Sequence, residues 1–372
     1  MKSRDPALAE LLARIERQER SIFIRGLEGT ARAFVMALLH RQLSRPVMVI
    51  TPTEKESRQL YRDLSFLSGS ERVFLYPPWD VVSTDLFTWQ RETELARSEG
   101  LCRLLSGEPF LAVAPVKAVL QKLPPREDIA AFCRRVSLGD FLDRDAWILS
   151  LLQGGYHRVT LVEGKGEFAV RGHVLDLFPP TAPHPYRLEF VGDEIESIRR
   201  FDPLSQRSRQ EIDEFSLTPA REMIMTEERQ ALGIRRARER ANELGLPRAV
   251  RDRLVERMAN GLTMSLNPLL LPLFYDDAVA PGFLLDYFSP VGLLIWDDSL
   301  AVARAGEDLS GEIDRLLLKA RQAERFFLER DAHYWSGDRP VRDGTNFQQL
   351  YLDNLALGGQ ADTLVLRAAP PT

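Results

Sequence analysis

The loop that begins at Gly26 has the residue types and spacing closest to a catalytic site in this chain. A phosphate-binding loop follows the pattern G-x-x-x-x-G-K-[ST] between a buried strand and a helix, and it holds phosphates and magnesium. Gly26 fills the first glycine position, and Gly29 lies inside the loop. The second glycine, the lysine and the hydroxyl are replaced by Ala31, Arg32 and Ala33. The pattern therefore predicts a nucleotide-site scaffold that has lost its nucleotide.

A pair of acids supplies the partner that such a loop would need. An apolar run ends at Asp297 and Asp298. At this place an ATPase holds magnesium with one acid and orients the attacking water with a glutamate. Asp297 fits the first role, whereas Asp298 is one methylene shorter than glutamate. We therefore expect Gly26, Gly29, Arg32 and Asp297 to form a degenerate site that binds no nucleotide. An active ATPase with an unusual loop is the alternative.

No other group of residues in the sequence predicts catalysis or metal binding. The five histidines have neither an H-E-x-x-H pattern nor paired-ligand spacing, and no G-x-S-x-G is present. Cys102 and Cys133 have no metal-site spacing and are typical of a reducing cytosol. We expect no catalytic residue, no metal and no cofactor in this chain.

The composition is typical of a cytoplasmic globular protein with two or three domains. The chain has 372 residues, of which 44% are hydrophobic and 28% charged, and its formal net charge is -5. This acidic balance argues against a generally basic nucleic-acid binder. The N-terminal stretch lacks the apolar core of a signal peptide, and no window reaches the roughly 18 apolar residues that span a bilayer. We therefore expect a cytoplasmic location and no membrane contact.

In the first third of the chain, buried-type strands alternate with helices. Apolar runs predict strands at 22–24, 47–50, 73–76 and 110–114, and helical patterns cover 5–19, 34–39, 53–67 and 92–105. Thr53 and Glu56 form a capping box at the start of one helix. Continuous apolar strands separated by helices predict a parallel sheet that is covered on both faces. Residues 1–125 are thus predicted to form one α/β unit.

Residues 126–217 are predicted to form a separate unit of mixed α+β type. A helix over 141–152 ends at a Gly-Gly pair and precedes several short strands with tight-turn signals between them. These strands are expected at 158–162, 167–171, 174–178, 186–190 and 195–201.

The chain becomes helical again from residue 218. Arginines over 227–258 alternate with acids, which is typical of a solvated helix face. A strand before Asp297 and a long helix from about Ser310 complete a unit over 218–345. Residues 346–372 are predicted to be a C-terminal linker or edge segment.

Basic and aromatic residues gather on or beside the strands of the 126–217 unit. They are Arg158, Lys165, Arg171, Arg187, Arg199, Tyr156, Phe168 and Phe178. A solvated sheet face would explain them. A protein interface would also explain them, because arginine and aromatic side chains dominate binding hot spots. From the residues alone both interpretations stay open.

Several segments, in one order, resemble a known family. They are the Gly26 loop, VITPTEKESRQLYRDL (49–64), YPPWD (76–80), AVAPVKAVLQKLP (112–124), GEFAVRGHVLDLFPP (166–180), RLEFVGDEIESIRRFDPLSQR (187–207) and FLLDYF (283–288). Together they are similar to the N-terminal, UvrB-like region of the bacterial transcription-repair coupling factors. The resemblance implies the fold of UvrB: a P-loop-NTPase-like parallel-sheet domain, split in sequence into 1A and 1B, with a mixed α+β domain 2 inserted between them.

The resemblance assigns 1–125 to domain 1A, 126–217 to domain 2 and 218–345 to domain 1B. UvrB carries G-x-x-G-x-G-K-T and D-E-S-H. This chain departs from the first motif at the loop positions given above, and from the second at Asp298 and Leu300. These departures favour the coupling factors over UvrB.

The resemblance also implies a partner, since domain 2 of this family binds UvrA. The arginines of that surface match Arg158 and Arg171, a third position falls on Ala169, and Phe178 is the expected apolar anchor. The implied function is a non-catalytic adaptor that recruits UvrA to stalled transcription complexes for nucleotide excision repair. RNA polymerase and DNA would be bound by regions beyond residue 372, and a C-terminal domain would contact and mask domain 2.

Two other functions remain as alternatives. One is a UvrB-like, ATP-dependent DNA-binding or helicase module with a divergent loop. The other is a DNA-binding module that uses the arginine-rich helices over 229–257.

Overall fold

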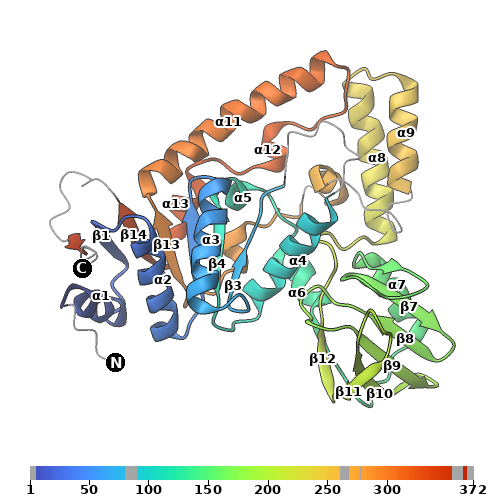
Figure 1. The fold of residues 1–372 in the computed structure, drawn as a ribbon. Helices are drawn as coiled ribbons and strands as arrows, with labels where there is room; N and C mark the ends of the chain where they lie inside the picture. The colour runs from blue at the N-terminus through green and yellow to red at the C-terminus, as the bar shows by residue number, and fades with distance from the viewer. Residues whose placement is uncertain (1–5, 80–89, 260–267, 277, 354–362, 367–372) are drawn as a thin grey trace.

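Two β-sheets and a helical hairpin organise the chain in the computed structural model, which describes residues 6–79, 90–259, 268–276, 278–353 and 363–366 (Figure 1). The larger sheet has seven strands, all parallel, in the order β15-β1-β14-β13-β2-β4-β3. They are β1 (Ser21–Arg25), β2 (Val47–Thr51), β3 (Val73–Leu75), β4 (Leu111–Pro115), β13 (Leu293–Asp297), β14 (Gln348–Asp353) and β15 (Thr363–Val365). The chain thus leaves this sheet after β4 and returns to it at β13, and the predicted α/β class is confirmed.

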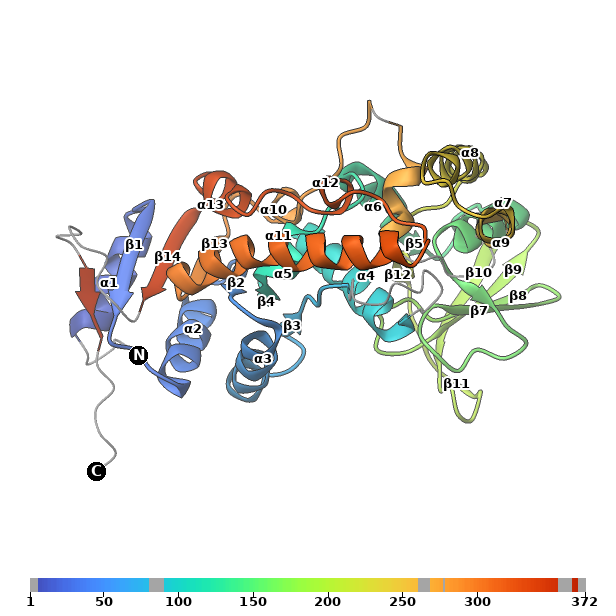
Figure 2. The same cartoon turned by 90° about the horizontal axis from the view of Figure 1, so that it is seen from above.

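Helices cover both faces of the larger sheet (Figure 2). One face packs against α1 (Pro6–Glu16), α2 (Thr30–Leu43) and α3 (Glu54–Ser68). The other packs against α4 (Arg91–Leu105), α5 (Val116–Leu120), α6 (Arg126–Phe132), α10 (Leu284–Tyr287) and α11 (Ser299–Gln322). Strand β2 shows the reason, because Val47 and Val49 enter the first core while Met48 and Ile50 enter the second. The short helices α12 (Arg330–His333) and α13 (Arg339–Gly344) precede β14.

The smaller sheet has six strands in the order β11-β10-β9-β8-β7-β6. They are β6 (His157–Arg158), β7 (Glu167–Arg171), β8 (Val174–Leu177), β9 (Tyr186–Val191), β10 (Glu194–Phe201) and β11 (Ser208–Glu211). Only the β6–β7 pair is parallel among these strands. Helix α7 (Arg144–Gln153) and the separate pair β5 (Arg134–Ser137) and β12 (Glu214–Leu217) share the same apolar core. This mixed unit is the α+β module predicted from the sequence.

A helical hairpin follows the smaller sheet. Helices α8 (Glu227–Glu243) and α9 (Arg248–Ala259) lie side by side and pack on the 3₁₀ helix η1 (Pro268–Phe274) (Figure 1). Their shared core is a fourth cluster of buried side chains, separate from those of the two sheets.

A buried polar cluster around Glu222 joins the mixed unit to the larger sheet. The Glu222 carboxylate accepts hydrogen bonds from Tyr76 Oη, Trp79 Nε1 and Arg97 Nε, each at 2.8 Å. Arg97, on α4, is fully buried, and its guanidinium also lies over the Tyr76 ring. Glu222 lies just after β12, where the chain leaves the mixed unit. The cluster therefore fixes that exit against β3 and α4.

The prediction of a linker or edge segment over 346–372 is wrong for β14, which lies between β1 and β13 inside the sheet. Its polar residues hid this position, but they are buried with partners. Gln349 Oε1 accepts hydrogen bonds from Trp296 Nε1 at 2.8 Å and from Tyr351 Oη at 2.9 Å. Strand β15, by contrast, lies at the edge of the sheet. The limits predicted at 125, 217 and 345 stay predictions.

The long helix predicted from about Ser310 begins earlier, at Ser299. Asp298 caps it, since its side chain accepts the backbone N–H of Ala301 at 3.1 Å. Gly306 lies inside the first half of α11, and glycine lowers intrinsic helix propensity. Tertiary packing on the sheet therefore forms a stretch of helix that local sequence does not indicate.

Candidate functional site

The loop between β1 and α2 has positive φ angles at both of its glycines, and a contact within the protein requires glycine at position 26. Gly26 has φ 86°, and a Cβ there would lie 2.6 Å from the backbone oxygen of Leu366. Gly29 has φ 53° and is the N-cap of α2. Both values fall in the left-handed region that favours glycine. The close approach of the Leu366 backbone therefore explains Gly26 without any phosphate.

An ion pair occupies the centre of the degenerate site. Arg32, in the first turn of α2, places Nη1 2.6 Å from Oδ1 of Asp297, at the end of β13. The two side chains are only 15% and 12% exposed. Arg32 Nε also donates to the Leu27 carbonyl at 3.0 Å, which fixes the guanidinium against the loop. Burial raises the pKa of Asp297, and the charge and hydrogen bond of Arg32 oppose that rise. The loop and the acid thus meet as a matched pair of charges.

The neighbouring acids have structural partners. Asp298 caps α11, and its φ of 65° places it in the left-handed region. Asp353, at the end of β14, accepts hydrogen bonds from both the backbone N–H and the hydroxyl of Ser299, at 2.9 and 2.8 Å. The Asp297–Asp298 segment is therefore tied into the start of α11. Among the described residues, no group of three or more His, Cys, Asp or Glu side chains could hold a metal ion.

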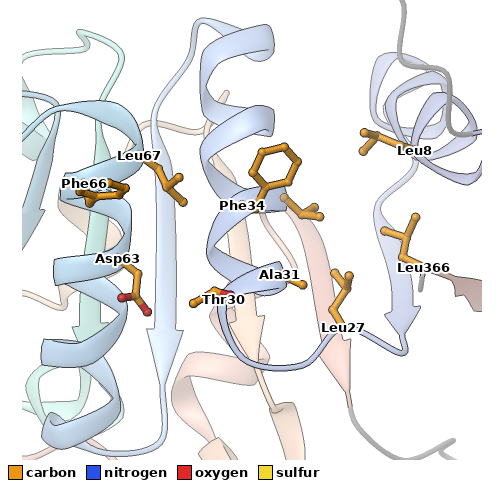
Figure 3. A pocket seen from close by; sticks show the side chains of 10 residues that line it. Leu8, Leu27, Thr30, Ala31, Phe34, Asp63, Phe66, Leu67 and Leu366 are labelled. Atoms are coloured by element: carbon orange, nitrogen blue, oxygen red, sulfur yellow. The ribbon is translucent and has the colours of Figure 1, made fainter. Parts of the chain in front are cut away.

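The cavity beside the loop is apolar (Figure 3). It has a volume of about 570 Å³ and lies between α1, α2 and α3. Its lining residues are Leu8, Leu27, Thr30, Ala31, Phe34, Val35, Asp63, Phe66, Leu67 and Leu366. Asp63 is the one ionisable side chain in this set, and its charge is negative. A triphosphate needs cationic and amide donors, so this lining does not suit one.

The two arginines predicted to bind a partner lie on neighbouring strands of the smaller sheet. Arg158 ends β6, the edge strand, and its side chain is exposed. Arg171 ends β7, next to β6, and its side chain is 52% exposed. Arg171 Nη2 lies 3.4 Å from Oδ2 of Asp176 on β8, which is a long contact. Both side chains are therefore accessible to solvent, Arg158 on the edge strand and Arg171 on the strand beside it.

The predicted apolar anchor has a different environment. Phe178 is only 8% exposed, and it packs in the core of the mixed unit with Phe168 and Leu177. Its backbone N–H and carbonyl continue the pairing with β7, through Glu167 O at 2.9 Å and Gly166 N at 2.6 Å. Phe178 therefore packs in the apolar core of the mixed unit and exposes little surface to a partner. Ala169 is buried as well.

Asp176 is the residue at this surface that sequence reasoning missed. Its buried carboxylate accepts two hydrogen bonds from Arg187, Nε to Oδ1 at 2.7 Å and Nη2 to Oδ2 at 2.9 Å. The Arg187 guanidinium also lies over the Phe201 ring, 4.8 Å from its centroid. Arg187 is thus held within the sheet, whereas Arg171 shares the same acid only weakly. The sequence did contain a signal for a buried acid, because Asp176 lies between Leu175 and Leu177 in a predicted strand.

Comparisons with known proteins show which sequences this chain resembles. Residues 135–223 match the family model of the UvrB interaction domain. The transcription-repair-coupling factor of Myxococcus xanthus is 35% identical over 299 residues, which cover 78% of this chain and 25% of that protein. That of Bacillus subtilis strain 168 is 30% identical over 301 residues, or 77% and 25% of the two chains. That of Escherichia coli K12 is 32% identical over 196 residues, or 53% and 17%.

This chain is similar in sequence to part of the transcription-repair-coupling factors. It spans about a quarter of the length of the first two of these relatives. The UvrB interaction domain runs from β5 to just beyond β12, so it contains both Arg158 and Arg171. In the part of the chain that the structure describes, no helix is long and apolar enough to cross a membrane.

Proposed function

We propose that this chain is a non-catalytic, UvrB-like adaptor module that binds UvrA. By doing so it would recruit UvrA to stalled transcription complexes for nucleotide excision repair. The observation that carries the proposal is the UvrB interaction domain over 135–223, attached to a sheet domain whose nucleotide loop is degenerate. A module that has kept its interaction domain while its phosphate-binding residues are replaced fits an adaptor better than a motor.

In this proposal the edge of the smaller sheet at β6 and β7 contacts UvrA. Arg158 and Arg171 present exposed guanidinium groups there. Arginine is enriched in binding hot spots because its planar group makes paired hydrogen bonds with carboxylates. We therefore expect acidic side chains on the UvrA surface. Phe178 contributes indirectly, by holding β7 in place.

The proposal assigns no enzymatic activity and no cofactor to this chain. Its support is twofold. Arg32 stands where a phosphate-binding loop has its lysine, and Asp297, the candidate magnesium ligand, is paired with that arginine. The alternative, a UvrB-like ATP-dependent DNA-binding or helicase module, requires that pair to open. Titration calorimetry with Mg-ATP separates the two functions, because binding in the micromolar range would support the enzyme.

The first two relatives are about four times longer than the region that matches this chain. We therefore propose the remaining activities for a longer protein that contains this sequence. RNA polymerase binding and DNA translocation would be carried by regions outside this sequence. A C-terminal domain would contact the UvrA-binding surface and mask it. The protein would act in the cytoplasm, where its transcription and repair partners are found.

The decisive experiment is a binding titration of the 372-residue chain with purified UvrA. We expect Arg171→Glu and Arg158→Glu each to weaken binding about 30-fold, which corresponds to about 2 kcal/mol at a hot spot. Arg207→Glu is the matched control, because Arg207 is an exposed arginine beside β11, at the opposite edge of the sheet. Equal UvrA binding by all three variants would refute the assignment of Arg158 and Arg171 to the interface. If the unaltered chain does not bind UvrA, the proposed function is refuted.

A further inference from the structure

The two cysteines of the chain meet in the structure although they are 31 positions apart. Cys102 lies on α4 and is 7% exposed, and Cys133 caps the C-terminus of α6 and is half-buried. Their sulfur atoms are 3.2 Å apart. A disulfide requires about 2.05 Å between sulfurs, so a movement of about 1 Å would join them.

We propose that Cys102 and Cys133 are a redox modification site that forms a reversible intramolecular disulfide with a peroxide or a low-molecular-weight disulfide as oxidant. With a peroxide, one thiol becomes a sulfenic acid and releases water. The second thiol then attacks that sulfur, the S–S bond forms and a second water leaves. With a small disulfide, two thiol–disulfide exchanges release two equivalents of the reduced small thiol.

The environment of each thiol sets the order of these steps. Cys133 is the more exposed, so it meets the oxidant first. The hydrogen bond with Cys133 and burial raise the pKa of Cys102, which makes it a poor nucleophile toward molecules in solution. Its contact with Cys133 nevertheless gives the second step the high effective concentration of an intramolecular reaction. Cys102 is thus the resolving thiol.

The position of the pair gives the disulfide a consequence. Cys133 immediately precedes β5, where the chain enters the mixed unit. Its neighbour Phe132 packs so closely on Gly154, at the end of α7, that a Cβ on the glycine would lie 2.2 Å from the ring. Helix α4 already holds the exit of that unit through Arg97 and Glu222. A disulfide would therefore attach the entrance of the unit covalently to the same helix.

The test uses the 372-residue chain, first reduced and then treated with hydrogen peroxide or oxidised glutathione. We expect the count of free thiols in denaturant to fall from two to zero, the mass to decrease by about 2 Da, and dithiothreitol to reverse both changes. Trypsin should release one linked peptide that joins residues 98–103 to 127–134. The oxidised chain should contain no intermolecular disulfide. It should melt at a higher temperature, because the bond closes a loop of the unfolded chain.

Two variants keep the proposal falsifiable. In Cys102→Ser, Cys133 should stop at a sulfenic acid that dimedone traps, or at a glutathione adduct. In Cys133→Ser, the buried Cys102 should stay reduced under the same conditions. The proposal is overturned if both thiols survive an oxidant that fully oxidises dithiothreitol. It is also overturned if the unaltered chain yields only intermolecular dimers or a singly modified Cys133.

Discussion

The ion pair between Arg32 and Asp297 compensates two buried charges, so removal of one partner should destabilise the larger sheet. We predict that Arg32→Met leaves the Asp297 carboxylate buried without its cation. Removing one partner of a fully buried pair costs about 3–5 kcal/mol. The two side chains keep 15% and 12% of their exposure, so we expect a loss of about 2–3 kcal/mol in the free energy of unfolding.

A double-mutant cycle with Asp297→Asn separates the pair from general packing effects. Each single variant should be destabilised, whereas the double variant should lie within about 1 kcal/mol of the unaltered chain, because no uncompensated charge remains. Urea unfolding followed by tryptophan fluorescence measures this, since Trp296 is buried next to Asp297. The surface pair of Arg17 with Glu10 is the control, and Arg17→Met should cause no measurable change.

The pH dependence gives a second signature of the same pair. Burial already raises the pKa of Asp297, and loss of Arg32 removes the group that opposes this rise. A carboxyl whose pKa is higher in the folded than in the unfolded state stabilises the fold below that pKa and destabilises it above. The loss of unfolding free energy in Arg32→Met, relative to the unaltered chain, should therefore become smaller as the pH is lowered. The corresponding difference for the double variant should not change in this way. A defect smaller than 0.5 kcal/mol at neutral pH, or additive single effects, would refute the reasoning.

Three further predictions concern other parts of the chain. Glu222→Ala should lower the free energy of unfolding by about 3–5 kcal/mol in urea titrations, because it leaves Arg97 buried without its acid. Gly26→Ala should cost about 1–3 kcal/mol in the same assay, since φ 86° and the Leu366 oxygen both oppose a Cβ. Burial lowers the pKa of His333 to about 4, so the unfolded chain binds more protons below about pH 6.5 and stability should fall by roughly 2–3 kcal/mol between pH 6.5 and 4. In urea titrations across that range, His333→Gln should show a shallower pH dependence.

Local patterns predicted the elements whose burial follows from their own sequence. Strand β7 has the predicted limits, 167–171, which follow from a short apolar run between turn residues. Of the capping box predicted at Thr53, the N-cap bond is present, with Oγ1 accepting the Glu56 N–H at 3.2 Å, while the Glu56 carboxylate accepts from the Thr53 hydroxyl at 2.7 Å. In both cases neighbouring residues carry the signal, so no tertiary contact had to be known. A short apolar run between turn residues and an N-cap side chain are enough to place such elements.

The parts that could not be predicted depend on contacts between distant segments. Strand β14 contains two glutamines whose partners are Trp296 and the backbone of α1. Phe178 has the sequence neighbourhood of an exposed strand end, yet the core of the mixed unit covers it. A single chain without its fold does not indicate which polar residue will find a buried partner or which aromatic one will be covered.

The Arg32–Asp297 pair links two segments that a bound nucleotide would bridge in a working site. In a working site the phosphates and magnesium bridge the loop after one strand and the acid after another. Here those two segments are 265 positions apart, and the whole mixed unit and helical hairpin lie between them in sequence. The guanidinium makes the bridge directly, from α2 to the end of β13. The two halves of the sheet domain are thus joined by the protein's own side chains.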